Sequence, residues 1–205
     1  MASTVSICNL ALGHLGADHI SSLTEASSEA RACNRFYGQT LDTLLAAGPP
    51  WRFARQEVSL AALAGESVAR WSYIYALPTD LIRVIEVRPG DETYTGAVLP
   101  EELDQFRPRG EPYELFGDRL YCNLSPAVLR YVSRIDDPSK FPPLFIEALS
   151  WHLAARLAMP LTRDADQRRA AFQMALQTQA AASAADANDE PQTSGFVSEY
   201  ERVRE

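Results

Sequence analysis

The stretch FPPLFIEALSWHLAARLAM, residues 141–159, decides the fold because it is the most apolar helical segment of the chain. Its polar residues do not gather into one broad face: they are Glu147, Ser150, His152 and Arg156. A helix that is apolar over most of its circumference must be covered on several sides. We therefore expect this segment at the centre of a helical bundle. Proline at position 160 predicts that the helix ends at Met159.

Two N-terminal segments carry apolar residues at helical spacing. In the first, after a cap at Ser3 or Thr4, they are Val5, Cys8, Leu12 and Leu15, and Gly16 ends the helix. In the second, after a cap at Ser27 or Ser28, they are Ala30, Cys33, Tyr37, Leu41 and Leu44, and Gly48-Pro49-Pro50 ends the helix. Each helix has one apolar face that needs a partner.

A last helix is predicted after the central one. Thr162 or Asp164 can cap its first turn, and the Ala-rich and Gln-rich pattern continues to about Ala187. Small side chains suit close packing between helices. The expected anchors of this helix are its larger apolar residues, Phe172, Met174 and Leu176.

Between the two helical regions the period changes to that of strands. Apolar and β-branched runs predict strands over 71–77, 81–87, 94–99 and 128–135, and a hairpin joins 113–116 to 119–122. Gly117 accepts the positive φ that the hairpin turn needs. Trp71, Tyr73 and Tyr75 alternate onto one face, which we interpret as the core side of a sheet and not as a platform for stacking bases. Along the last strand, Val128, Arg130, Val132 and Arg134 share one face and Leu129, Tyr131, Ser133 and Ile135 share the other, and one of the two faces is expected to be wet.

These elements predict an α+β protein that is mainly α. Residues 1–187 are expected to form a single domain, in which helices 4–47 and 141–187 pack together as a bundle and residues of about 70–135 form an inserted antiparallel β lobe. Residues 188–205 are expected to be a flexible C-terminal docking tail.

The docking tail contains apolar residues at i, i+4 and i+7, namely Phe196, Tyr200 and Val203, with Val197 beside them. This spacing fits an amphipathic helix that lies in a groove of a partner. Fraying is the usual behaviour of chain ends and remains the alternative. The four residues are the candidate partner-binding residues of the chain.

Composition disfavours several functions. The net charge of −8 argues against a surface that neutralises phosphates, and no apolar run approaches the roughly 20 residues that cross a bilayer. No motif of a catalytic centre is present, and the three histidines and three cysteines lack metal-ligand spacing. We therefore expect no enzyme activity, no cofactor, no metal and no membrane partner. Cys8, Cys33 and Cys122 are expected to be reduced, and Cys8 and Cys33 to act as small apolar residues. A cytosolic protein is expected.

Five segments in series carry a resemblance: Ile7–Gly16 (ICNLALGHLG), Ile20–Leu23 with Glu29–Cys33, Pro50–Ala54 (PWRFA), Tyr75–Val84 (YALPTDLIRV), and Ala148-Leu149 with Leu157–Thr162 (LAMPLT). In this series, which covers about residues 5–180, the chain resembles the tail tubular protein A family of tailed bacteriophages. Members of that family are head-to-tail adaptors, also called gatekeepers or connectors. Residues 188–205 match no motif of the family.

The resemblance implies a structural virion protein that forms a ring, normally dodecameric, at the head-tail junction. Its implied partners are the portal protein, the tail or nozzle protein and copies of itself. The C-terminal segment is implied to reach toward the portal, and DNA to pass through the channel without specific binding. Assembly in the host cytoplasm and location in the virion follow. An acidic channel wall would repel DNA within roughly 8 to 10 Å.

Three other interpretations stay open. Within the phage interpretation, a stopper or neck ring protein is the nearest alternative. A small DNA-binding regulator would use the two N-terminal helices, although the second offers only Arg31 and Arg35 for phosphate contacts. An enzyme or ligand-binding module would need a pocket that contains Glu147, His152 and Arg156 with mutually shifted ionisation.

Overall fold

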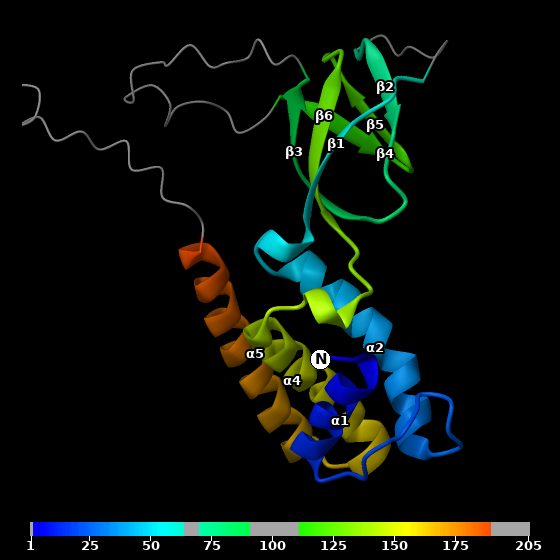
Figure 1. The fold of residues 1–205 in the computed structure, drawn as a ribbon, viewed down its shortest axis with the longest axis vertical. Coiled ribbons are helices and arrows are strands. Elements are labelled where there is room, and N and C mark those ends of the chain that lie inside the picture. The colour runs from blue at the N-terminus through cyan, green and yellow to red at the C-terminus, as the bar shows by residue number, and fades with distance from the viewer. Residues whose placement is uncertain (1, 64–69, 91–110, 190–205) are drawn as a thin grey trace, which may run out of the picture.

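The computed structural model describes residues 2–63, 70–90 and 111–189, and it places helices at one end and strands at the other (Figure 1). The described residues contain four α-helices and two three-stranded antiparallel sheets. The predicted fold class, a mainly α helical bundle with an inserted antiparallel β lobe, is confirmed.

The two N-terminal helices begin and end close to the predicted residues. Helix α1 spans Thr4–Leu15, is capped by the Ser3 hydroxyl and ends at Gly16, whose φ of 67° is left-handed. Helix α2 spans Ser28–Ala47, is capped by the Ser27 hydroxyl and ends at Gly48. Because these caps satisfy amide groups that the helix itself cannot pair, the sequence signals locate both ends.

Helix α4, Pro143–Thr162, contacts the three other α-helices of the described residues and forms the centre of the bundle, as predicted. Leu149, Leu153 and Leu157 are fully buried in it. The predicted end at Met159 is wrong, because Pro160 lies inside the helix. The helix continues through Thr162, three residues beyond Met159, and is followed by the C-cap residue Arg163, which adopts a φ of 56°.

Helix α5, Ala165–Asn188, is capped by Asp164 and lies along α4 (Figure 1). Its buried residues are Ala171, Ala175 and Ala182. The prediction that its larger apolar residues anchor it is therefore wrong: Phe172 is 51% exposed, Met174 37% and Leu176 51%. The alanine face lets the two helix axes approach closely, which a face of large side chains would prevent.

The β lobe contains two sheets. One has the strand order β1-β6-β3 and is formed by β1 (Arg55–Ser59), β3 (Leu81–Pro89) and β6 (Ala127–Ser133). The other has the order β2-β5-β4 and is formed by β2 (Tyr73–Ala76), β4 (Tyr113–Phe116) and β5 (Arg119–Cys122). Gly117 has a φ of 60° in the hairpin turn between β4 and β5, as predicted.

The lobe starts earlier in the chain than expected. Strand β1 pairs with β6, with Arg55 opposite Val132, so the lobe begins at Arg55 and not at about residue 70. Four of the five β1 residues are exposed. An exposed edge strand does not need alternating apolar residues, and its composition therefore gave no strand signal.

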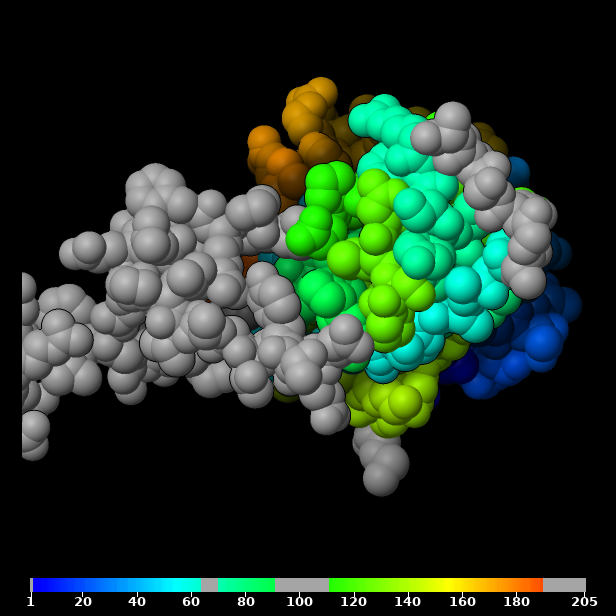
Figure 2. Space-filling model, turned by 90° about the horizontal axis from the view of Figure 1, so that it is seen from above, coloured from blue at the N-terminus to red at the C-terminus, as the bar shows by residue number. Residues whose placement is uncertain are grey.

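Strand β6 links the two parts of the molecule. Leu129 and Tyr131 belong to the core of the lobe, whereas Val132 belongs to the core of the bundle. On the face that Val128, Arg130, Val132 and Arg134 share, Val128 and Arg130 are half-buried and Arg134, just beyond the strand, is exposed, whereas Val132 is fully buried where β6 approaches the helices. Viewed from the lobe end, the cyan and green strands lie in front of the blue and orange helices (Figure 2).

The aromatic residues of the second sheet are not all on its core side. Trp71 and Tyr75 are buried, as predicted, but Tyr73 is 37% exposed and Ile74 is buried in its place. The Trp71 indole donates a hydrogen bond to Glu114 on β4 at 2.8 Å. The predicted strand 94–99 and the whole of 190–205 lie outside the described residues.

Candidate interaction surfaces

Large apolar side chains are exposed on both parts of the molecule. The bundle exposes Leu10, Leu144, Met159, Phe172, Met174 and Leu176, and the lobe exposes Val58, Tyr73, Leu115 and Phe116. Phe172 and Leu176 are one turn apart on α5, so they share a face of that helix. Scattered single exposures are normal, whereas neighbouring ones mark a surface that a partner can cover.

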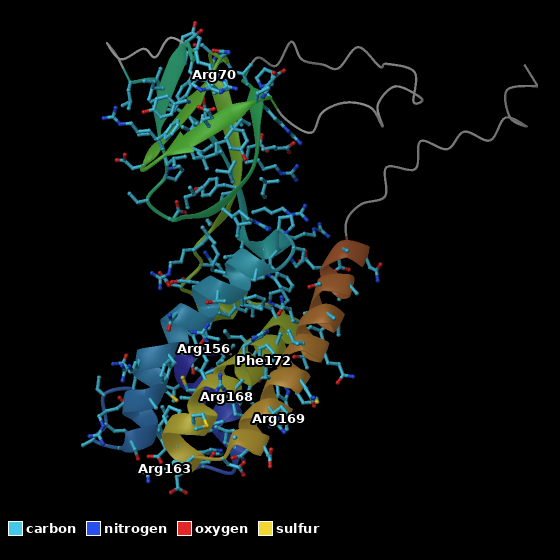
Figure 3. The ribbon with its side chains drawn as sticks, turned by 180° about the vertical axis from the view of Figure 1, so that it is seen from behind. Arg70, Arg156, Arg163, Arg168, Arg169 and Phe172 are labelled. Carbon is cyan, nitrogen blue, oxygen red and sulfur yellow. The ribbon has the colours of Figure 1, made fainter. Side chains whose placement is uncertain are left out.

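A cleft of about 600 Å³ lies between α4 and α5, with α2 at its side, and we call it the arginine cleft. Besides two alanines, it is lined by Thr43, His152, Arg156, Arg168, Arg169 and Phe172. Figure 3 shows Arg156 on α4 beside Phe172 and Arg168 on α5. The cleft therefore joins an exposed aromatic ring to a group of cations.

The charges of the arginine cleft are only partly compensated. Arg156 donates a hydrogen bond to the Thr43 hydroxyl at 3.1 Å, which leaves its charge unpaired there. Arg169 pairs with Asp166 at 3.0 Å, one turn away on the solvent side of α5. No ion pair of the described residues includes Arg168. This leaves a locally positive surface on a chain with a net charge of −8.

The pocket that an enzyme interpretation required is not assembled. His152 lies in the arginine cleft, 2.8 Å from Gln179, and burial lowers the pKa of its imidazole, with a further contribution from Arg156. Glu147 does not line the cleft and accepts a hydrogen bond from the Trp151 indole at 2.8 Å. The Glu147 carboxylate and the His152 imidazole therefore contact different residues.

The histidine of α1 also has a packing role. The His14 ring stacks on Trp151 with the ring centres 3.6 Å apart, and its Nε2 lies 3.0 Å from the Ser150 hydroxyl. Burial lowers the pKa of His14, against an opposing effect of Glu147. The ring thus ties α1 to α4.

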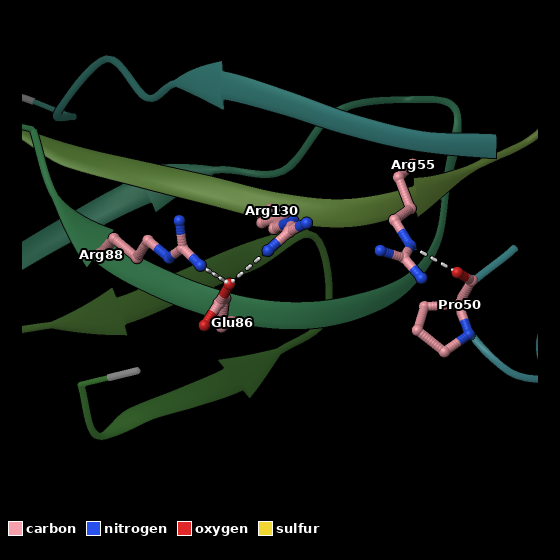
Figure 4. Close-up of polar contacts among 5 residues, drawn as sticks. All are labelled: Pro50, Arg55, Glu86, Arg88 and Arg130. Atoms are coloured by element: carbon pink, nitrogen blue, oxygen red, sulfur yellow. Dashed lines mark hydrogen bonds and ion pairs between the residues drawn. The ribbon is translucent and has the colours of Figure 1, made fainter. Parts of the chain in front are cut away.

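A second polar group lies where the lobe meets the end of α5. Glu86 on β3 is 8% exposed, pairs with Arg88, and accepts a hydrogen bond from Arg130 on β6 at 3.1 Å (Figure 4). Nearby, Arg55 donates to the Pro50 carbonyl. With Asp186 of α5, these residues line a cleft of about 550 Å³. Since the carboxylate is already paired twice, we interpret this group as a structural joint.

The cysteines are free thiols, as expected from the sequence. All three cysteines are unpaired and buried, and Cys8 and Cys33 lie in the bundle core. A hydrogen bond between them raises the pKa of Cys8 and lowers the pKa of Cys33. Over the described ranges, no three metal-ligating side chains come together, and no helix has the length and hydropathy of a membrane span.

The predicted partner-binding residues, Phe196, Val197, Tyr200 and Val203, lie outside the described residues and stay predictions. The arginine cleft was missed from sequence because its cations come from two different helices. One signal for it existed: Arg168 and Arg169 are adjacent near the start of an otherwise Ala-rich helix.

A family model for the SU10 adaptor protein matches residues 23–197, which is most of the chain and includes the lobe and helices α2, α4 and α5 of the bundle. The chain belongs to the SU10 adaptor protein family. The resemblance drawn from the five sequence segments is thereby confirmed at the level of a phage adaptor, while the narrower assignment to the tail tubular protein A family is not supported. A structural adaptor family also agrees with a non-enzymatic role. No curated protein matches the adaptor.

Proposed function

We propose that this adaptor forms a ring, normally of twelve copies, between the portal and the tail of a phage virion and lets the genome pass through its channel. The observation that carries the proposal is the family match over residues 23–197. In this proposal the virion is the final location, and assembly on the portal takes place in the host cytoplasm.

The surface of the adaptor supports a role in assembly. Exposed apolar side chains occur on α1, α4, α5 and the lobe, as given above, and each can be covered by a neighbouring copy. The net charge of −8 suits a protein through which DNA passes without binding, because phosphate binding needs a cationic surface. We also propose that a copy stays monomeric until a portal ring templates the adaptor ring.

The C-terminal residues Phe196, Val197, Tyr200 and Val203 are proposed to bind the portal. Their spacing places apolar side chains on one face of a helix. Ordering these residues costs roughly 1 to 2 kcal/mol each in backbone entropy, so they order only on a surface that buries the apolar side chains.

Electron microscopy of the adaptor mixed with purified portal rings tests the function. We expect an additional ring at the narrow end of the portal. If the protein were instead a stopper or neck ring protein, it would bind only to a portal that already carried an adaptor ring. Failure to bind the portal in any form contradicts the proposal, whereas a stable ring of the adaptor alone contradicts only the templating step.

Paired variants test the role of the C-terminal residues. Phe196→Ser with Tyr200→Ser is expected to weaken portal binding at least tenfold, which corresponds to about 1.4 kcal/mol. Gln192→Ser with Thr193→Ser changes the same region without changing an apolar residue and is expected to bind as the wild type does. Equal binding by both pairs would remove these residues from the interface.

A further inference from the structure

The arginine cleft continues into an apolar stripe along α5. Arg168, Phe172 and Leu176 are four residues apart, so they lie on one face of the helix, with Arg168 nearest its start. Phe172 and Leu176 are each 51% exposed. A segment that runs antiparallel to α5 over this face would meet two apolar side chains first and the cations of the cleft afterwards.

Residues 196–201 of the same chain, with the sequence FVSEYE, carry the complementary order. Phe196 and Val197 come first, and Glu199 and Glu201 follow on either side of Tyr200. This six-residue stretch contains no cation. The apolar start matches Leu176 and Phe172, and the two carboxylates match Arg168, Arg169 and Arg156.

The length of the chain permits this contact within one molecule. From Phe172 to the end of α5 at Asn188 is 16 residues of helix, or about 24 Å. The eight steps from Asn188 to Phe196 span at most about 26 to 29 Å when extended. Phe196 can therefore reach the level of Leu176 with slack and that of Phe172 with an extended connection.

We propose that residues 196–201 dock in the arginine cleft of their own chain when no portal is present. The interaction surface is the face formed by Leu176, Phe172, Arg168, Arg169 and Arg156. A short connection keeps the local concentration of the segment high, on the order of millimolar, which favours its own chain over a second copy. The contact does not depend on ring formation, and it excludes simultaneous binding of the same residues to another protein.

The cleft is matched to an acidic peptide better than to nucleic acid. A duplex presents a regular row of phosphates and no apolar group that would cover Phe172 and Leu176, the two exposed apolar residues of this surface. The net charge of −8 also repels DNA over the rest of the surface. DNA binding at the cleft is the competing outcome of the test.

Photo-crosslinking of the full-length chain tests the proposal. A photoreactive phenylalanine analogue replaces Tyr200, and equal amounts of normal and ¹⁵N-labelled protein are mixed before irradiation without portal. We expect crosslinks to peptides that contain Arg156 or residues 165–176, and only between peptides of the same isotope. Crosslinks that join light to heavy peptides would show docking on a second copy and overturn the proposal, as would crosslinks spread over other surfaces.

Charge variants add a second readout. Arg168→Glu is expected to lower the crosslink yield at least fivefold, and Glu199→Arg with Glu201→Arg in the same chain is expected to restore it. Arg31→Glu, an exposed cation on the first turn of α2, is the matched control and should leave the yield unchanged. If Arg168→Glu fails to fold, Glu199→Gln with Glu201→Gln gives the same decrease without touching the bundle.

A gel shift with a short duplex separates the nucleic-acid outcome. We expect the wild-type protein to show no duplex binding that depends on Arg168, so Arg168→Glu should leave the gel shift unchanged. A crosslink yield that resists charge reversal, or specific DNA binding through Arg168, would each contradict it.

Discussion

His14 and His152 are the two imidazoles whose pKa burial lowers below the ordinary value of 6.5. The unfolded chain therefore takes up protons on both residues as the pH falls through about 6.5, before the folded protein does. Proton uptake by the unfolded state alone favours unfolding. We expect the free energy of unfolding to decrease from pH 7 toward pH 5, as measured by urea unfolding at several pH values.

The control for this effect is His19, which is exposed. His14→Gln with His152→Gln should flatten the dependence between pH 7 and 5, and His19→Gln should retain it. The Glu25 carboxylate affects stability in a lower pH range. Hydrogen bonds from Ser27 and Ser21 lower its pKa from 4.5 to about 2, so its contribution to the free energy of unfolding is lost only as the pH falls below about 4.5. An unchanged slope in the double variant would contradict the assignment.

The second prediction at the residue scale concerns the alanine face of α5. Ala175 is fully buried, so Ala175→Leu inserts a side chain where there is no space for it. We expect a loss of about 1 to 3 kcal/mol in unfolding free energy. Ala170→Leu, on the exposed side of the same helix, should change it by less than about 0.5 kcal/mol in denaturant titrations. Equal losses would mean that the face is assigned incorrectly.

At the scale of elements, the end of α1 depends on one left-handed residue. A Cβ at Gly16 would contact no other atom within 4 Å, but the φ of 67° is unfavourable for any residue with a Cβ. Gly16→Ala is therefore expected to cost about 1 kcal/mol for conformational reasons alone. Thermal unfolding followed by circular dichroism measures the loss.

Gly13 provides the matched comparison, because it lies inside the same helix with its nearest neighbour, His19 Nε2, at 3.8 Å. Gly13→Ala should stabilise the protein by about 0.5 to 1 kcal/mol, since alanine has the higher helix propensity. A decrease in stability for Gly16→Ala together with an increase for Gly13→Ala would confirm that left-handed Gly16 caps the helix. A loss of stability in both would point to packing at this end of the helix.

At the scale of the whole molecule, the two cores differ in size. The bundle core includes residues from all four helices, whereas the lobe core is a small group that includes Tyr75, Leu120 and Leu129. Strands β2, β4 and β5 have only four residues each. Hydrogen exchange should therefore be at least roughly tenfold slower for the α4 amides than for the amides of this sheet. Equal protection would show that both parts open as one cooperative unit.

The sequence alone determined which segments become helices and where most helices end. Helical spacing, Ser and Asp caps, Gly16 and Gly48 are local signals, because helix hydrogen bonds join residues only four apart. The apolar circumference of residues 141–159 likewise placed α4 at the centre. The helix end predicted from Pro160 was wrong, because tertiary packing of the helix can offset the unfavourable energy of an internal proline. No local sequence pattern reveals that packing.

Only the tertiary structure decided which faces are covered. Alanines and not Phe172 anchor α5, because α4 offers a surface that requires close approach. Strand β1 exists because β6, about seventy residues later in the chain, supplies its hydrogen-bond partners. The arginine cleft joins Arg156 to Arg168 across two helices. Such contacts depend on the path of the whole chain, whereas spacing within one segment records only that segment's own periodicity.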